Sequence, residues 1–277
     1  MTNRRVASLA IAVAVMVMLS LAPVYSAISI DGYVIGSGGS AMSGGTYSLN
    51  GTVGQAVVGS MTGGTYLLQS GFWYTVGSEE PAVEIANLRE AKTQADGTVV
   101  HASGKKATTD PSDFATYFYI EEPNRNSGIR VVPLGVTGTL VRGVTIDVTG
   151  TMATTPAGER YIDQATVIAS GTPAPLGPVG MVNKTVGGST VGTPPAGQYG
   201  VPGGTGTNNV GLLVRVWGKV LSSGSDYLII DDGSGVSLRV DTTGAPSVPT
   251  TGYVLVTGIS SLNGTSPTAE RLILAID

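Results

Sequence analysis

The second half of this chain contains the same order of sequence motifs twice. In each copy a Gly-Lys pair precedes an apolar strand ending in two acids, then an Arg-containing strand, a Val-Thr-Gly triplet and a Glu-Arg pair. The matched blocks are 104–105, 117–122, 127–131, 148–150 and 159–162 in the first copy, and 218–219, 227–232, 234–240, 256–258 and 270–273 in the second. Five blocks in one order indicate two copies of a small β domain.

Composition favours turn-rich β structure throughout. The 277 residues include 41 glycines, and only 12% of the chain is charged. This length is sufficient for two domains and a smaller unit, each with its own core.

The N-terminus has the pattern of a secretory signal. Arg4 and Arg5 precede a mostly apolar run over residues 6–22, and small residues then allow a cut after Ser26. We expect residues 1–26 to be a signal peptide and the mature chain to be extracellular or at the cell surface, without a transmembrane anchor. An uncleaved membrane anchor is the alternative, because the apolar run is close to spanning length.

The charge and cysteine content exclude several classes of function. Removal of the signal leaves 13 basic and 19 acidic residues, a net charge of −6, which does not favour binding to polyanions. The chain has no cysteine, which excludes disulfides, thiol catalysis and thiolate metal sites. The sequence predicts no cofactor and no metal site.

Residues 27–77 contain a repeat of their own. The segment 42–49 recurs as 61–68, and each Gly-Gly pair predicts a tight turn that enters a strand. We therefore expect a small Gly-rich β-hairpin repeat unit, with a flexible linker as the alternative.

This stretch resembles a short N-terminal segment of many secreted bacterial proteins. The matching residues are 44–49, the pair Gly54-Gln55 and the triplet Gly71-Phe72-Trp73. The resemblance implies a role in surface display or packing rather than catalysis.

The rest of the chain divides at changes in composition. We expect one β domain over 83–170, a Gly- and Pro-rich connection over 171–207 and a second β domain over 208–277. The one helix predicted spans residues 83–91, where Ile85 and Leu88 share a face.

The second copy predicts five strands within about 70 residues, which favours a closed small barrel. The strand that ends in Gly-Lys, the Tyr-Leu-Ile-Ile-Asp-Asp strand, the acidic Gly turn and the Arg-Val strand resemble strands one to four of the OB-fold. The resemblance covers both copies. The predicted fold class is therefore all-β, with two tandem five-stranded OB-like barrels after the hairpin unit.

Catalytic chemistry is mostly missing from the sequence. His101 is the single histidine and no Gly-x-Ser-x-Gly motif accompanies it, so a Ser-His-Asp hydrolase is disfavoured. The pairs Glu121-Glu122 and Asp231-Asp232 recur in both copies, which fits strand and turn geometry better than paired catalytic acids. We predict that the protein is not an enzyme.

A ligand-binding strand face is the remaining hypothesis. If Val214 and Val216 point inward, Arg215 and Trp217 point outward, and stacking on exposed rings then holds a base or a sugar. The candidate residues are Tyr117, Tyr119, Arg130, Arg215, Trp217, Tyr227 and Arg239. The competing interpretation is that these aromatic rings pack inside the molecule.

The sequence thus favours a non-catalytic, secreted cell-envelope protein whose barrels serve as binding or assembly modules. Self-association or a cell-surface partner is one prediction. Binding of single-stranded nucleic acid is the alternative that the OB-fold resemblance implies, and carbohydrate binding is the third. The nucleic-acid interpretation is weakened because acids outnumber bases in both copies, ten to eight and six to four.

Overall fold

The computed structural model describes residues 82–243 and 248–276, together with the backbone of strands 38–44, 47–53, 59–63 and 66–70. The predicted signal peptide and the Gly54-Gln55 and Gly71-Phe72-Trp73 motifs lie outside the described residues. The chain divides into two compact units, Met1–Glu79 and Glu80–Asp277. The structure is all-β, as predicted.

The first unit contains two hairpins with matching registers. Strand β1 (Gly38–Gly44) pairs with β2 (Tyr47–Val53), and β3 (Gly59–Gly63) pairs with β4 (Tyr66–Ser70). Met42 lies opposite Leu49 in one hairpin, and Met61 lies opposite Leu68 in the other. The sequence repeat therefore corresponds to a structural repeat.

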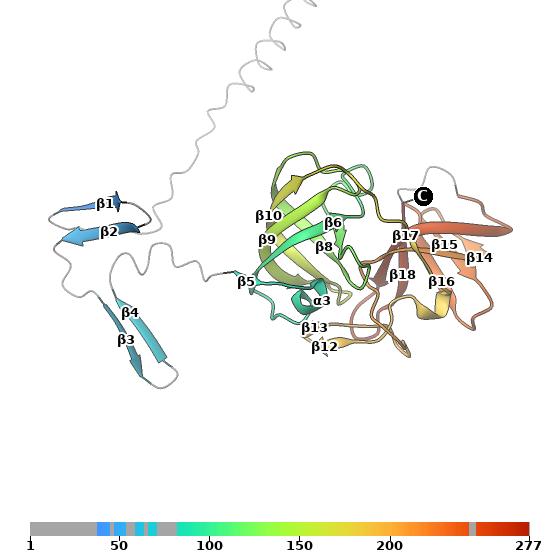
Figure 1. The fold of residues 1–277 in the computed structure, drawn as a ribbon. Helices are drawn as coiled ribbons and strands as arrows, with labels where there is room; N and C mark the ends of the chain where they lie inside the picture. The colour runs from blue at the N-terminus through green and yellow to red at the C-terminus, as the bar shows by residue number, and fades with distance from the viewer. Residues whose placement is uncertain are drawn as a thin grey trace, which may run out of the picture. The chain divides into compact units, whose positions relative to one another are not determined.

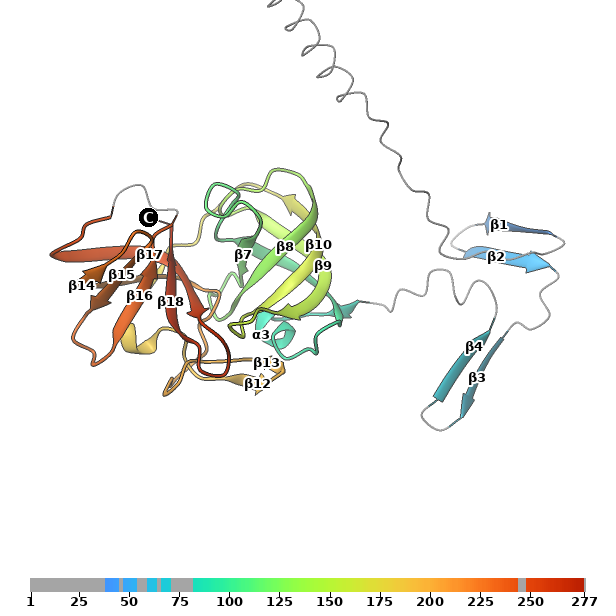
Figure 2. The ribbon, with the colours of Figure 1, turned by 180° about the vertical axis from the view of Figure 1, so that it is seen from behind.

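The second unit contains two closed sheets, which we call the first ring and the second ring. Figures 1 and 2 show them side by side, in green to yellow and in orange to red. The strands of the first ring are β6 (Val99–Ala107), β7 (Phe118–Glu121), β8 (Gly128–Thr137), β9 (Thr145–Thr154) and β10 (Arg160–Ser170). Those of the second ring are β14 (Leu213–Ser223), β15 (Tyr227–Asp231), β16 (Ser237–Asp241), β17 (Tyr253–Asn263) and β18 (Glu270–Ala275).

Both rings close in the same order. The first runs β6-β7-β8-β10-β9 and returns to β6, and the second runs β14-β15-β16-β18-β17 and returns to β14. In each ring the third and fifth strands in sequence are parallel, while the other pairings are antiparallel. Closure leaves no long free edge in either ring.

Each ring encloses its own apolar core, because alternate residues of a strand point inward. In β14, Val214 and Val216 are buried while Arg215 and Trp217 are exposed, as the alternation predicts. Leu228 and Ile230 are also buried in the core of the second ring.

The structural repeat begins earlier than the matched motifs. Strand β5 (Val83–Glu84) pairs in parallel with the start of β6, and β11 (Val179–Gly180) pairs in parallel with the start of β14. A short helical turn follows each one, α3 (Leu88–Ala91) and η1 (Asn183–Thr185). The helix predicted over 83–91 is therefore right only for its last turn, because Val83 and Glu84 pair with β6 and Asn87 caps the helix at Arg89 N.

Residues 171–207, expected to be a connection, carry four short elements. Besides β11 and η1 they form the hairpin of β12 (Val191–Thr193) and β13 (Ala196–Gln198). The Gln198 side chain accepts a hydrogen bond from Arg160 N at 2.9 Å and donates to Gly158 O at 2.9 Å. An insertion ahead of the second ring is thus bound to the first.

The two rings touch through backbone as well as side chains. A Cβ placed on Gly128 of β8 meets Gly211 O, just ahead of β14, at 2.3 Å. Only glycine permits this approach. Beside it, Tyr119 of β7 packs with Leu213 of β14 and Ile259 of β17 in a shared buried cluster.

Candidate functional site

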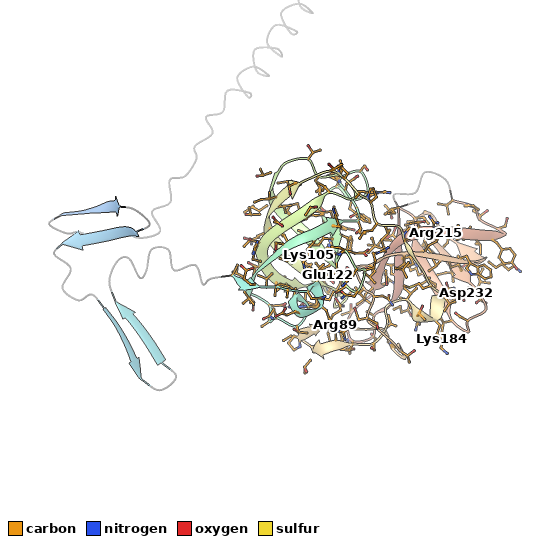
Figure 3. The ribbon with its side chains drawn as sticks, in the orientation of Figure 1. Arg89, Lys105, Glu122, Lys184, Arg215 and Asp232 are labelled. Atoms are coloured by element: carbon orange, nitrogen blue, oxygen red, sulfur yellow. The ribbon has the colours of Figure 1, made fainter. Side chains whose placement is uncertain are left out.

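The outer surface of β14 and β17 in the second ring carries a cluster of exposed aromatic and aliphatic side chains. Four large hydrophobic side chains are exposed here: Trp217 at 49%, Leu221 at 56%, Tyr253 at 71% and Leu255 at 66%. We call these four residues, together with Arg215 and Lys219, the tryptophan face. Figure 3 labels Arg215 in this part of the ring.

Strand register explains why these side chains gather. Trp217 lies opposite Leu255, and Lys219 lies opposite Tyr253. The rings of Trp217 and Tyr253 are 6.2 Å apart between centroids and tilted by 33°. Arg215 donates from Nε to Thr257 Oγ1 at 3.0 Å, which fixes one cation at the border of the apolar group.

An apolar hollow of about 250 Å³ adjoins the tryptophan face at Tyr253 and Leu255. Its remaining lining consists of Leu228, Val240, Thr242, Val248, Pro249, Val254, Val256 and Ala275. An aliphatic side chain of a partner fits this chemistry, since most of the lining is apolar.

The prediction that Tyr119 belongs to an exposed binding face is wrong. Its side chain is fully buried, because the outer face of β7 is covered by the second ring. Its hydroxyl donates to Glu159 Oε1 at 2.8 Å.

The other predicted aromatics already have partners on their ring faces. The Arg130 guanidinium lies 3.6 Å from the Tyr117 ring centroid, and Phe114 stacks on Tyr117 at 4.8 Å. In the second ring Arg239 lies 4.0 Å from the Tyr227 ring centroid. The structure therefore brings Tyr117 together with Arg130 and Tyr227 together with Arg239, in equivalent places.

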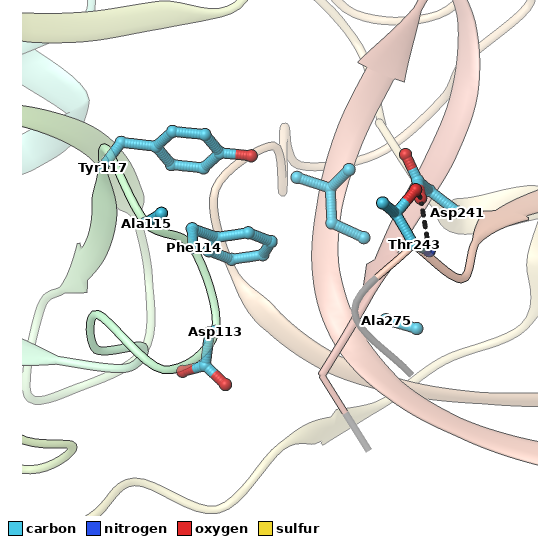
Figure 4. A pocket seen from close by; sticks show the side chains of 8 residues that line it. Asp113, Phe114, Ala115, Tyr117, Asp241, Thr243 and Ala275 are labelled. Carbon is cyan, nitrogen blue, oxygen red and sulfur yellow. Dashed lines mark hydrogen bonds between the residues drawn. The ribbon is translucent and has the colours of Figure 1, made fainter. Parts of the chain in front are cut away.

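A second hollow of about 380 Å³ lies where the two rings meet (Figure 4). Phe114 and Tyr117 form one wall, and Asp241 and Thr243 form the other. Asp241 Oδ1 accepts from Thr243 N at 2.9 Å and Oγ1 at 2.6 Å. This hollow belongs to the contact between the rings.

A buried polar network stabilises that contact. Glu159 Oε2 accepts from Ser261 Oγ at 2.9 Å while its other oxygen accepts from Tyr119. Burial raises the pKa of Glu159, and hydrogen bonds from Tyr119 and Ser261 oppose the rise. Lys92 Nζ donates to Val210 O at 2.6 Å, and burial lowers the pKa of Lys92 to about 7.

The Glu121-Glu122 pair has a structural role within the described residues. Glu121 accepts from Leu213 N of the second ring, and Arg125 Nε donates to it at 2.8 Å. Glu122 accepts from Leu88 N at 2.7 Å and pairs with Lys105 at 2.8 Å (Figure 3). Burial raises the pKa of Glu121. One acid therefore joins the rings and the other fixes α3.

The acidic pair of the second ring forms the turn that its sequence predicts. Asp231 Oδ1 accepts from Gly233 N and Asp232 Oδ1 accepts from Ser234 N, each at 2.9 Å. Within the described ranges no cluster of three or more His, Asp or Glu is placed to hold a metal ion.

Sequence reasoning did not select Tyr253 and Leu255. The same alternation that placed Arg215 and Trp217 outside was available for β17, since Val254 and Val256 point inward. The pairing of β14 with β17 then required the barrel topology, which local patterns do not supply.

The chain matches no protein-family model and no curated protein. No helix in the described part of the chain is long and apolar enough to cross a membrane.

Proposed function

We propose that this is an exported, non-catalytic binding protein built from two OB-fold barrels, which docks a protein partner through the tryptophan face. The signal-like N-terminus supports export to the extracellular space or cell surface, and the turn and packing roles of the acidic pairs support a non-catalytic role.

The strand order supports the OB-fold assignment. Each ring closes as strands 1-2-3-5-4, with strand 3 parallel to strand 5 and a helical turn before strand 1. In a β-solenoid, successive coils pair in parallel to form continuous sheets. Here the two rings share no strand, and each strand of a ring pairs with others of the same ring.

The tryptophan face carries the proposal. Four of the nine large hydrophobic side chains that are exposed in the described residues lie on it. Exposed apolar groups bordered by polar residues are typical of protein interaction sites, and Trp, Tyr and Arg contribute most often to binding energy there.

The exposed leucines separate a protein partner from the other ligand classes. The rings of Trp217 and Tyr253 alone would allow a sugar or a base to stack on them. Leu221 and Leu255, however, have no group that hydrogen-bonds to sugar hydroxyls or to phosphates. The adjoining hollow is apolar as well. Single-stranded nucleic acid also requires more positive charge than Arg215 and Lys219 supply in an acidic chain.

A site-specific crosslinking experiment tests the proposal. A photoreactive residue at position 255 of the full mature chain should crosslink a defined protein from the extracellular material of the producing cell. Substitution of Trp217 and Tyr253 by serine should remove that product. The matched control places the photoreactive residue at Leu134, which is 76% exposed on the first ring.

Two results would contradict this function. One is crosslinking at positions 134 and 255 to the same extent with no effect of the serine substitutions. The other is tight binding of a glycan or single-stranded DNA that depends on Trp217, because either ligand assigns the face to a different class.

A further inference from the structure

Two arginines occupy equivalent places in the two rings. Arg160 begins β10 and lies opposite Thr154, while Arg271 follows the first residue of β18 and lies opposite Leu262. Each is the second residue of the repeated Glu-Arg motif. The hydrogen-bond acceptors around the two guanidinium groups can therefore be compared position by position.

Both terminal nitrogens of the Arg160 guanidinium have acceptors, whereas its Nε is buried without one among the described residues. Its Nη1 contacts the Asp96 carboxylate and lies 2.6 Å from Thr154 Oγ1, and its Nη2 donates to Gln94 O. The residue is fully buried. The first ring therefore neutralises its arginine internally.

The second ring has no equivalent of the Asp96 and Thr154 side chains. The amide of Gly97 donates to Met152 O, and that of Gly211 donates to Ser260 O, so the two segments superpose residue by residue. Val210 then replaces Asp96, and Leu262 replaces Thr154. Both are buried in an apolar cluster.

Arg271 is consequently left without the acceptors that Arg160 has. Its Nε, like that of Arg160, is buried without a hydrogen-bond partner among the described residues. The terminal nitrogens of Arg271 have neither of the acceptors that Asp96 and Thr154 provide to Arg160. A ligand in the adjoining hollow supplies acceptors in their place.

Arg271 lines a hollow of about 570 Å³ on the outside of the second ring. Arg239 lines it too, and because that guanidinium stacks by its face on Tyr227, its edge remains available to donate. The polar residues that complete the lining are Ser237, Asn263, Thr268 and Glu270.

The equivalent place in the first ring is closed. Arg130, the counterpart of Arg239, lies beside Glu159, whose carboxylate is buried against the second ring. Glu270, the counterpart of Glu159, is exposed. The first ring uses this surface to contact the second ring. The second ring does not use its matching surface for that contact, so the hollow there stays open.

We propose that this hollow binds an anionic sugar, with its phosphate, sulfate or carboxylate group held between Arg271 and Arg239. Two guanidinium groups recognise such oxyanions through paired N–H donors. The volume exceeds that of a single oxyanion, and Ser237, Asn263 and Thr268 provide hydrogen-bonding groups for hydroxyls. This site is separate from the tryptophan face and does not depend on its function.

Calorimetric titration of the full mature chain tests the site with glucose 6-phosphate, glucuronate, inorganic phosphate and uncharged glucose as probes. We expect glucose 6-phosphate or glucuronate to bind more tightly than inorganic phosphate, and glucose to show no binding. Replacing Arg271 with Gln should weaken binding about ten- to hundredfold, as expected for lost hydrogen bonds to a charged group. Arg239→Gln should act in the same direction.

Lys184→Gln is the matched control, since it removes an exposed positive charge from the same unit away from the hollow. Its affinity should equal that of the unsubstituted chain. Thermal unfolding of each variant without ligand establishes that the fold is retained, and Arg271→Lys should recover part of the affinity if charge is required. The proposal is overturned if no probe binds, if glucose binds as well as its phosphate, or if Arg271→Gln and Lys184→Gln lose affinity equally.

Discussion

The first and second rings share one strand plan but use their outward positions differently. Thr149 and Thr257 are equivalent, so alignment of the strands places Ser103 where the second ring has Trp217. By the same alignment Asp147 corresponds to Leu255, and Thr145 to Tyr253. The inward positions stay apolar in both rings, whereas these three outward positions are polar in the first ring and aromatic or aliphatic in the second.

The reverse holds on the opposite strands. Tyr119 of β7 and Gly128 of β8 in the first ring are buried against the second ring, while their counterparts, Ile229 of β15 and Ser237 of β16, line an open hollow. One copy thus uses this surface for internal docking, and the other leaves it accessible. The two rings therefore share a core pattern and differ in their outward surfaces.

The two rings should differ most in how much stability is lost when the glutamate of the repeated Glu-Arg motif is replaced, Glu159 in the first ring and Glu270 in the second. Glu159→Ala should lower the free energy of unfolding by about 3 kcal/mol, because the hydroxyls of Tyr119 and Ser261 lose their acceptor inside the contact. Glu270→Ala should change it by less than about 0.5 kcal/mol, since that side chain is exposed. Urea unfolding followed by circular dichroism measures both, and equal losses would contradict the assignment.

A smaller loss is expected where the backbones meet. Gly128→Ala should lower the free energy of unfolding by about 2 kcal/mol, because the new Cβ overlaps Gly211 O and forces the rings apart. Gly135→Ala is the control on the same strand, with no atom within 4 Å of the added Cβ. The second ring has Ser237 at the position of Gly128, so it is unable to make the same close contact. Comparable losses in both variants would show that the rings do not pack this tightly.

The contact between the rings should also make stability depend on pH. Because the pKa of Lys92 is lowered to about 7 in the folded state, the unfolded chain binds more protons between pH 7 and about 10. The free energy of unfolding should therefore rise with pH in this range, by at most about 1.4 kcal/mol per pH unit. The raised pKa values of Glu121 and Glu159 act oppositely, with stability lost as pH rises from about 4.5 through those values.

Chemical unfolding at pH 7, 8 and 9 checks the sign of the Lys92 effect. Lys92→Met should flatten the rise, whereas Lys219→Met, at an exposed lysine of the second ring, should keep it. A flat profile for the unsubstituted chain would rule out Lys92 as a buried, neutralised amine.

The repeat in the second half of the chain predicted most of the strands of the fold. It located the strands of the second ring within a few residues, because Val, Ile and Leu alternate with polar residues there and glycine turns separate the runs. It did not locate β5 and β11, since strands of two residues carry no periodicity.

The candidate site was only partly predictable, for a reason that Tyr119 illustrates. Alternation correctly places its side chain outside the first ring, but the second ring covers that outside surface. Local pattern distinguishes inward from outward on one strand, while docking of a neighbouring domain depends on contacts between distant residues. Arg130 and Arg239 were among the predicted residues, but their stacking on Tyr117 and Tyr227 depends on which strands lie side by side, and local patterns do not supply that.

The smallest effect on stability is expected on the tryptophan face. Trp217→Ala should change the free energy of unfolding by no more than about 0.5 kcal/mol, because half of its side chain is exposed and its contact with Tyr253 is made at the surface. Val216→Ala, one position earlier on β14, should cost about 2 kcal/mol, since it opens a cavity in the core. Equilibrium unfolding in urea of both variants measures the contrast. A large loss for Trp217→Ala would mean that this ring stabilises the fold, and an aromatic group that stabilises the fold is not free to bind a partner.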